Sequence, residues 1–116
     1  MTFCFGPEIK SQILFTGHTG WQLVAEQYEC KSDDEVRIKW VDDVKTCAEK
    51  CAGKASMFAF GTTDFKESYS CDGNKCWCAC ESGANADGSC DKLFNEGYRL
   101  YKLTEGIITV EKNLNI

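Results

Sequence analysis

The alternation of apolar and polar residues predicts short strands on both sides of a single helix. Residues 36–41 alternate, and we expect Val36, Ile38 and Trp40 to share one face of a half-buried strand. Aromatic and β-branched residues predict further strands over residues 21–28, 57–60, 98–103 and 107–110. Small and polar residues predict turns over Gly17–Gly20 and Asp72–Asn74.

Residues 44–52 have the period of an amphipathic helix. Their apolar positions fall three and four residues apart, at Val44, Cys47, Ala48, Cys51 and Ala52. Asp42 or Asp43 can cap the N-terminus, and Gly53 can end the helix. The pattern therefore predicts an α+β fold, with one main helix packed on an antiparallel sheet of about five strands.

The chain has nine cysteines among its 116 residues, which predicts a disulfide framework formed in an oxidising compartment. Cys47 and Cys51 lie one helical turn apart, about 6 Å along the axis. Cys78 and Cys80 lie about 7 Å apart along a strand. The helix can therefore be linked to that strand by two parallel disulfides. Their partners come from Cys76, Cys78 and Cys80, in an order that the spacing leaves open.

The remaining cysteines extend this scheme. Cys71 and Cys76 flank a turn and can close a hairpin, while Cys30 and Cys90 can tie the two ends of the domain together. Cys4 is then the odd residue, either a free thiol or a bridge to a second chain in a homodimer. The competing hypothesis is a metal–thiolate cluster, but zinc usually takes Cys-x2-Cys from a turn, so disulfides are favoured.

These features together resemble the PAN/apple family. The pattern comprises a strand that ends at Cys30, the helical segment Val44–Cys51, the strand Met57–Gly61, and Cys90 before a closing strand. The resemblance covers residues 17–104, with an N-terminal extension over residues 1–16 and a C-terminal strand or tail over residues 105–116.

The resemblance implies a helix cradled by a curved antiparallel sheet, a disulfide between Cys30 and Cys90, and helix-to-sheet bridges from Cys47 and Cys51. The chain departs from the family pattern where Ala55-Ser56 replaces a cysteine ahead of the Phe strand. Domains of this family are extracellular modules that bind proteins or carbohydrates and have no catalytic site.

Charge narrows the possible partners. The net charge of −5 and the lack of a basic stripe argue against nucleic acid and against anionic lipid. No apolar run approaches the roughly 20 residues of a membrane-spanning helix. The sequence has no signal-peptide pattern, so for a secreted protein we expect the leader to have been removed already.

Catalysis has little support in the sequence. The single histidine, His18, is expected in an exposed turn, and no nucleophile, phosphate-loop or zinc-protease motif is present, so we predict no enzyme activity and no cofactor. The carboxylates Asp33, Asp34, Glu35, Asp42 and Asp43 are expected in solvated loops and helix caps. Residues 85–91 are expected to form a plain turn rather than a calcium loop.

Recognition has more support. Trp77 lies between Cys76 and Cys78, so its ring is expected to point away from the disulfides, either as an exposed platform or into a secondary core. Tyr69, Lys75 and Tyr98 are candidate neighbours of Trp77. We therefore expect a secreted, non-enzymatic module that binds a carbohydrate or a protein surface. The alternatives are a secreted toxin, inhibitor or defence protein and, third, an intracellular metal–thiolate protein.

Overall fold

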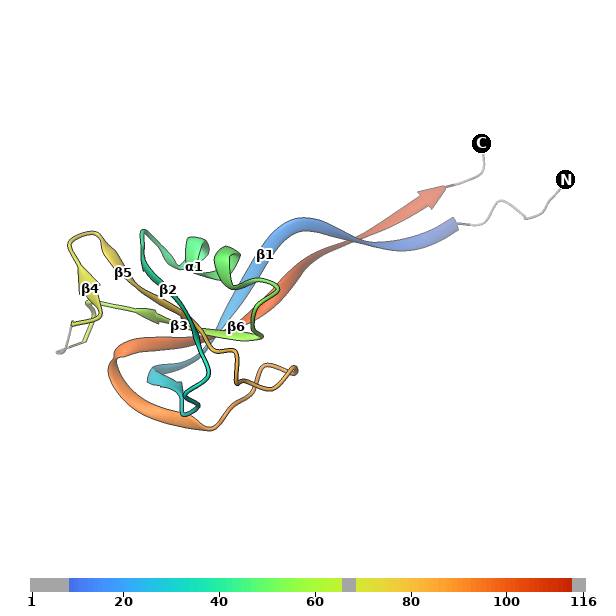
Figure 1. The fold of residues 1–116 in the computed structure, drawn as a ribbon. Coiled ribbons are helices and arrows are strands. Elements are labelled where there is room, and N and C mark those ends of the chain that lie inside the picture. Colours follow the sequence, from blue (N-terminus) through green and yellow to red (C-terminus); the bar gives the residue numbers. More distant parts are fainter. Residues whose placement is uncertain (1–8, 66–68, 114–116) are drawn as a thin grey trace, which may run out of the picture. The chain divides into compact units, whose positions relative to one another are not determined.

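The computed structural model describes residues 9–65 and 69–113 (Figure 1). The chain divides into two compact units, residues 19–104 and a second unit formed by residues 1–18 and 105–116. Side chains are described within residues 19–104, and all contacts below belong to that unit. Cys4 lies outside the described residues, so its predicted bridge to a second chain stays a prediction.

The described residues form one six-stranded sheet and one short helix, which places the protein in the α+β class with six strands rather than about five. The strand order is β1-β6-β3-β5-β2, with β4 paired to β5, and β5 pairs antiparallel with β2, β3 and β4. The strands are β1 (Ile9–Cys30), β2 (Val36–Val41), β3 (Met57–Gly61), β4 (Cys71–Asp72), β5 (Lys75–Cys80) and β6 (Lys92–Asn113).

The turn predicted over Gly17–Gly20 is wrong, because β1 continues through these residues. The neighbouring strand β6 has the same length of 22 residues, and it also includes the segment 107–110 that was predicted as a separate strand. Gly20 lies close to β6, because a Cβ atom there would meet the Thr104 side chain. Glycine in this segment therefore marks packing between strands rather than a change of direction.

Helix α1 (Val44–Cys51) lies over one side of β2, β5 and β3 (Figure 1). Asp43 caps it by accepting a hydrogen bond of 2.8 Å from the Thr46 amide, as the sequence indicated. Its C-cap is Ala52, and Gly53 follows in the left-handed region with φ of +81°. Within the described part of the chain, no helix is long and apolar enough to span a membrane.

Four disulfides join the described cysteines. Cys47 bonds to Cys78 and Cys51 to Cys80, which resolves the open order of the two helix-to-sheet bridges. Cys30 bonds to Cys90 and Cys71 to Cys76, in agreement with the scheme from spacing. Four such bonds indicate an oxidising environment.

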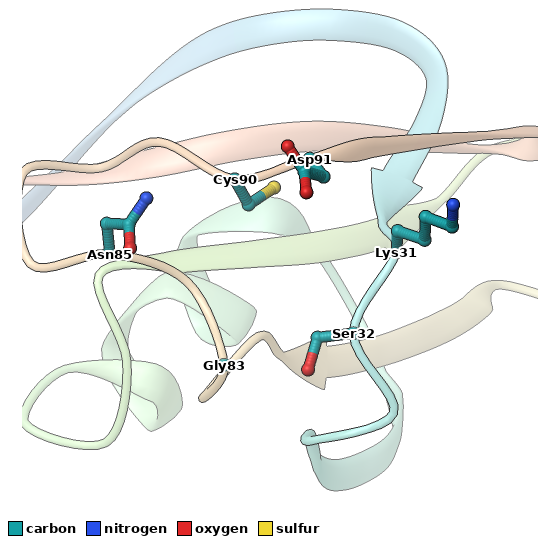
Figure 2. Close-up of a pocket in the computed structure, with 6 residues that line it drawn as sticks. All are labelled: Lys31, Ser32, Gly83, Asn85, Cys90 and Asp91. Carbon is teal, nitrogen blue, oxygen red and sulfur yellow. The ribbon is translucent and has the colours of Figure 1, made fainter.

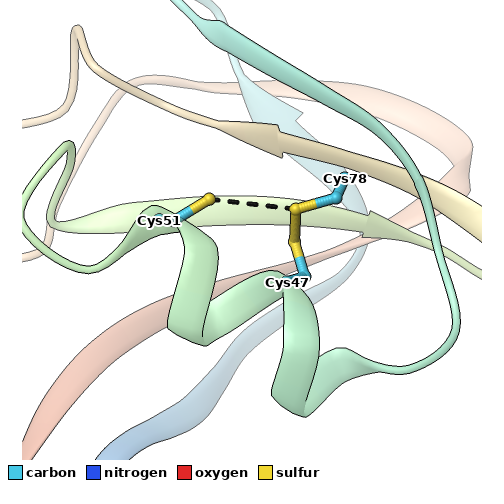
Figure 3. A group of neighbouring side chains, drawn as sticks. All are labelled: Cys47, Cys51 and Cys78. Carbon is cyan, nitrogen blue, oxygen red and sulfur yellow. Dashed lines mark hydrogen bonds between the residues drawn. A yellow bond between two sulfur atoms is a disulfide. The ribbon is translucent and has the colours of Figure 1, made fainter.

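The two helix-to-sheet disulfides pack against each other. Figure 3 shows the sulfur of Cys51 beside that of Cys78, at 3.8 Å. Because both atoms already belong to disulfides, neither carries a proton, and the contact is one of van der Waals packing. The close grouping of the Cys47, Cys51 and Cys78 sulfurs follows from this packing and leaves no thiolate for a metal.

A bulge in β2 overturns the expectation that Trp40 shares a face with Ile38. The register of β2 against β5 shifts between Arg37 and Lys39, and Lys39 has a φ of +82°. Ile38 therefore packs on the cluster beneath α1, whereas Trp40 pairs with Trp77.

Candidate binding groove

The face of the sheet opposite α1 carries a cavity of about 210 Å³, which we call the groove. Alternate residues of β3 and β5 point to opposite faces, so Phe58 and Cys78 pack beneath α1 while Ala59 and Ala79 point away from it. Ala59 and Ala79 are paired across the two strands, and their small side chains leave the space open. The groove is lined by Glu29, Glu35, Ala59, Tyr69, Trp77, Ala79, Asn95 and Tyr98.

Three aromatic rings form the walls of the groove. Trp77 packs edge-to-face against Trp40, with ring centroids 5.2 Å apart, and Tyr69 lies at a steep angle to Tyr98, at 6.3 Å. Burial raises the pKa of Tyr98 to about 12, so its hydroxyl keeps its proton at neutral pH. The walls therefore offer apolar ring surface together with a hydroxyl group that can donate.

Tyr69 is held at the groove by its neighbour Ser70. Ser70 is buried, its hydroxyl donates to the Gly97 carbonyl, and its own carbonyl accepts from the Trp77 amide at 2.7 Å. A Cβ atom on Gly61 would lie 2.5 Å from the Ser70 carbonyl oxygen, and one on Gly97 would lie 3.1 Å from the Tyr69 ring. Gly61 and Gly97 therefore allow Tyr69 and Ser70 to lie close to the sheet.

A chain of hydrogen bonds forms the polar wall. The Tyr69 hydroxyl donates to Asn95 Oδ1, and Asn95 Nδ2 donates to Glu29 Oε2. The Gly97 amide also donates to Asn95 Oδ1, at 3.3 Å. These bonds fix the orientation of Asn95 and leave the second oxygen of Glu29 available to accept.

Three carboxylates gather at the groove, where Glu29, Glu35 and Glu81 each place one oxygen within 4.8 Å of the others. Glu81 is only 1% exposed. Its Oε2 accepts from the Cys30 amide at 2.6 Å, whereas its Oε1 has no partner among the described residues.

The protonation of Glu81 is set mainly by its burial. Burial raises the pKa of Glu81 to about 8; the Cys30 hydrogen bond opposes the rise, and the charges of Glu35 and Glu29 add to it. Without a counter-charge, Glu81 therefore holds a proton over most of the neutral range. Glu35 is also 3.2 Å from the Arg37 guanidinium, a contact on the solvent side.

Three of the four predicted ligand-binding residues meet at the groove. Tyr69, Trp77 and Tyr98 line it together, whereas Lys75 does not; its ammonium group lies 3.2 Å from the Asp42 carboxylate. Phe94 is exposed but packs against Tyr28, away from the groove lining.

Sequence reasoning missed Glu29, Asn95 and Glu81. Glu35 lies in a loop as expected and is partly exposed, but it also lines the groove. Glu81 carried the clearest signal, since it directly follows the strand pattern Cys76-Trp77-Cys78-Ala79-Cys80. By contrast, the turn predicted over residues 85–91 is confirmed: Ser89 donates to Asp87 at 2.6 Å and accepts from Asn85. These side chains satisfy one another in the turn.

A second hollow lies beside the Cys30–Cys90 disulfide (Figure 2). It has a volume of about 430 Å³ and is lined by Lys31, Ser32, Gly83, Asn85, Cys90 and Asp91. Figure 2 shows Lys31 and Ser32 across from Asn85. Its lining has no aromatic ring, so it offers less for specific recognition than the groove.

No family model matches the chain, and no curated protein or solved structure matches it either. Functional inference for this protein therefore starts from the residues of the groove.

Proposed function

We propose that the chain is a secreted, non-enzymatic recognition module of PAN/apple type that binds a carbohydrate in the groove. The observation that carries this proposal is the meeting of three aromatic rings with carboxylate and amide groups over a floor of two alanines. A sugar ring has apolar C–H faces that pack on aromatic rings and hydroxyl groups that hydrogen-bond to carboxylates and amides. At about 210 Å³, the groove is smaller than pockets for drug-sized ligands, which suits one ring of a longer glycan.

The scaffold supports the PAN/apple part of the proposal. One helix lies on an antiparallel sheet, and the Cys30–Cys90 disulfide joins strand β1 to the segment just before β6, as the resemblance implies. The other disulfides fix α1 and the β4–β5 hairpin to the same sheet. A framework held in this way has little conformational freedom left to lose when a ligand binds.

The charge of the groove narrows the class of glycan. Glu29 and Glu35 line it, and the chain as a whole has a net charge of −5. Sulfated or sialylated sugars would meet electrostatic repulsion there. We therefore expect neutral sugars, or amino sugars with a free ammonium group, to be preferred.

A glycan array with three proteins tests this proposal. The parent is expected to bind a restricted set of neutral or amino glycans, and Tyr69→Ala, which removes a ring that is 59% exposed, is expected to lower that affinity at least tenfold. Phe94→Ala is the matched control, because Phe94 is equally exposed (58%) but lies outside the groove lining. Absence of glycan binding by the folded parent, or equal losses in both variants, would contradict the proposal.

A basic side chain of a protein partner is the second candidate ligand. It is favoured by Glu29 and Glu35 together with the aromatic rings, which can attract a cation. Surface plasmon resonance with lysine-rich and matched norleucine-containing peptides distinguishes this candidate. If the protein binds only the lysine-rich peptides, if Tyr69→Ala abolishes that binding, and if no glycan binds, the ligand is a protein partner and not a carbohydrate.

A further inference from the structure

Three carboxylates converge from two parts of the chain, with Glu29 and Glu35 at the two ends of one loop and Glu81 far from them in sequence. Glu29 belongs to β1, Glu35 lies just before β2, and Glu81 directly follows β5. Each places one oxygen within 4.8 Å of the other two. The tertiary fold brings the oxygen of Glu81 to those of Glu29 and Glu35.

Glu81 gives this cluster a feature that a solvated acidic patch lacks. Its side chain is 1% exposed, and Oε1 has no hydrogen-bond partner among the described residues. A buried polar atom without a partner is rare in folded proteins, because burial removes its hydration without replacement. Among residues 19–65 and 69–104, no lysine or arginine forms an ion pair with Glu81 or Glu29.

When Glu81 is ionised, a bound cation would coordinate its unpartnered oxygen and offset the repulsion among the three carboxylates. We propose that Glu29, Glu35 and Glu81 form a site for a divalent cation, and that calcium is the preferred ion. All three groups offer oxygen, the ligand of hard cations, and no nitrogen or thiolate accompanies them. Calcium tolerates irregular oxygen geometry better than magnesium, which demands a near-ideal octahedron.

The position of the site gives the cation access. Glu29 and Glu35 are partly exposed and line the groove, so an ion can enter from solvent and reach Glu81 behind them. Extracellular calcium modules bind with dissociation constants of about 10⁻⁴–10⁻³ M. We expect an affinity in that range, and the ion would share Glu29 and Glu35 with the groove.

Calorimetric titration of the metal-free protein with CaCl₂ tests the proposal, together with thermal unfolding in EDTA, CaCl₂ or MgCl₂ at equal ionic strength. We expect one saturable calcium site, a melting temperature several degrees higher in about 10 mM CaCl₂ than in EDTA, and a smaller shift with MgCl₂. No saturable heat and no calcium-dependent shift would overturn the proposal.

Matched variants locate the site. Glu29→Gln and Glu35→Gln keep the side-chain shape and are expected to weaken calcium binding at least tenfold, as is Glu81→Gln. Glu49→Gln, at an exposed position of α1, is the control and is expected to bind like the parent. If Glu81→Gln does not fold, the variants at Glu29 and Glu35 still test whether the cluster binds calcium. Unchanged binding in both of them, or an equal loss in the control, would show that the cluster holds no specific ion.

Discussion

The two faces of the sheet are built by the same strands and have opposite characters. Beneath α1, the cluster contains Cys47, Cys51, Phe58, Cys78 and Cys80, and each of these residues has an exposed fraction of 0%. On the other face, alternate residues of those strands form the floor of a groove whose walls are partly exposed aromatic rings and carboxylates. The face beneath α1 is dry and fastened by two disulfides, whereas the other face combines the buried cluster of Cys30, Met57 and Leu100 with the open groove.

This difference indicates how the fold divides its tasks. Two disulfides hold α1 against the sheet, where the cross-strand pair of Phe58 and Tyr101 stacks with ring centroids 5.1 Å apart. Because that face supplies much of the stability, the groove face can retain open space and a buried carboxyl group that burial alone would disfavour. Each prediction below tests whether stability belongs to one face and binding to the other.

The largest effect is expected for loss of a disulfide beneath α1. The double variant Cys51→Ala, Cys80→Ala is expected to lower the free energy of unfolding by about 3–5 kcal/mol, because it removes a cross-link and fully buried sulfur packing. Cys71→Ala, Cys76→Ala is the comparison, since this bridge spans only 5 residues and is partly exposed, and about 2 kcal/mol or less is expected. Urea unfolding without reductant measures both values, and equal losses would show that burial beneath α1 adds nothing to the effect of the cross-link.

Much of the face beneath α1 could be predicted from the sequence because its signals are local. The period of Val44–Cys51 and the alternation of Val36–Val41 fixed a helix and a strand at their observed positions. Two similar spacings along a helix and a strand predicted that Cys47 and Cys51 bond to two of Cys76, Cys78 and Cys80, and the partners are Cys78 and Cys80.

The groove was harder to predict because it depends on contacts between distant residues. Strand alternation indicated that Trp77 would face away from the disulfides, but the bulge at Lys39 that brings Trp40 beside it has no signature in the sequence, since lysine rarely adopts a positive φ. The long β1 and β6 strands and the meeting of Glu29, Glu35 and Glu81 likewise follow from pairing across the whole domain.

The next largest effect is expected from Glu81, on the groove face, and it depends on pH. The carboxyl group has a pKa of about 8 in the folded protein and an ordinary value of 4.5, so the folded state binds the proton more tightly. Its contribution to stability is therefore fully present below about pH 4.5 and is lost as the pH rises to about 8. Between these two pKa values, the contribution of Glu81 to the free energy of unfolding falls by at most about 1.4 kcal/mol per pH unit. The total loss expected is roughly 2–4 kcal/mol.

Glu81→Gln tests this expectation, because the amide cannot lose a proton in this range. In EDTA, the variant is expected to gain stability relative to the parent between pH 5 and pH 8, measured by urea unfolding at each pH. A constant difference between the two proteins would mean that Glu81 titrates normally and that the groove face carries no buried charge.

A smaller effect is expected at the helix cap, which belongs to the fastened face. Asp43→Ala removes the acceptor for the Thr46 amide and is expected to lower the free energy of unfolding by more than Asp42→Ala does. Asp42→Ala is the matched control, because its carboxylate forms only an exposed ion pair with Lys75, and surface pairs of this kind contribute about 0–1 kcal/mol. A larger loss for Asp42 than for Asp43 would show that the link to Lys75, and not the cap, positions α1.

The smallest effect on stability is expected at Tyr69, the most open wall of the groove. Tyr69→Phe deletes the hydroxyl that donates to Asn95 but keeps the ring, and Asn95 still accepts from the Gly97 amide. Because Tyr69 is 59% exposed, water can replace the lost partner, and the free energy of unfolding is expected to change by no more than about 0.5 kcal/mol. A loss well above 1 kcal/mol would show that the hydrogen-bond chain from Tyr69 to Glu29 stabilises the domain. In that case even the most exposed residue of the groove would contribute to stability, and the groove could not be described as a face for binding alone.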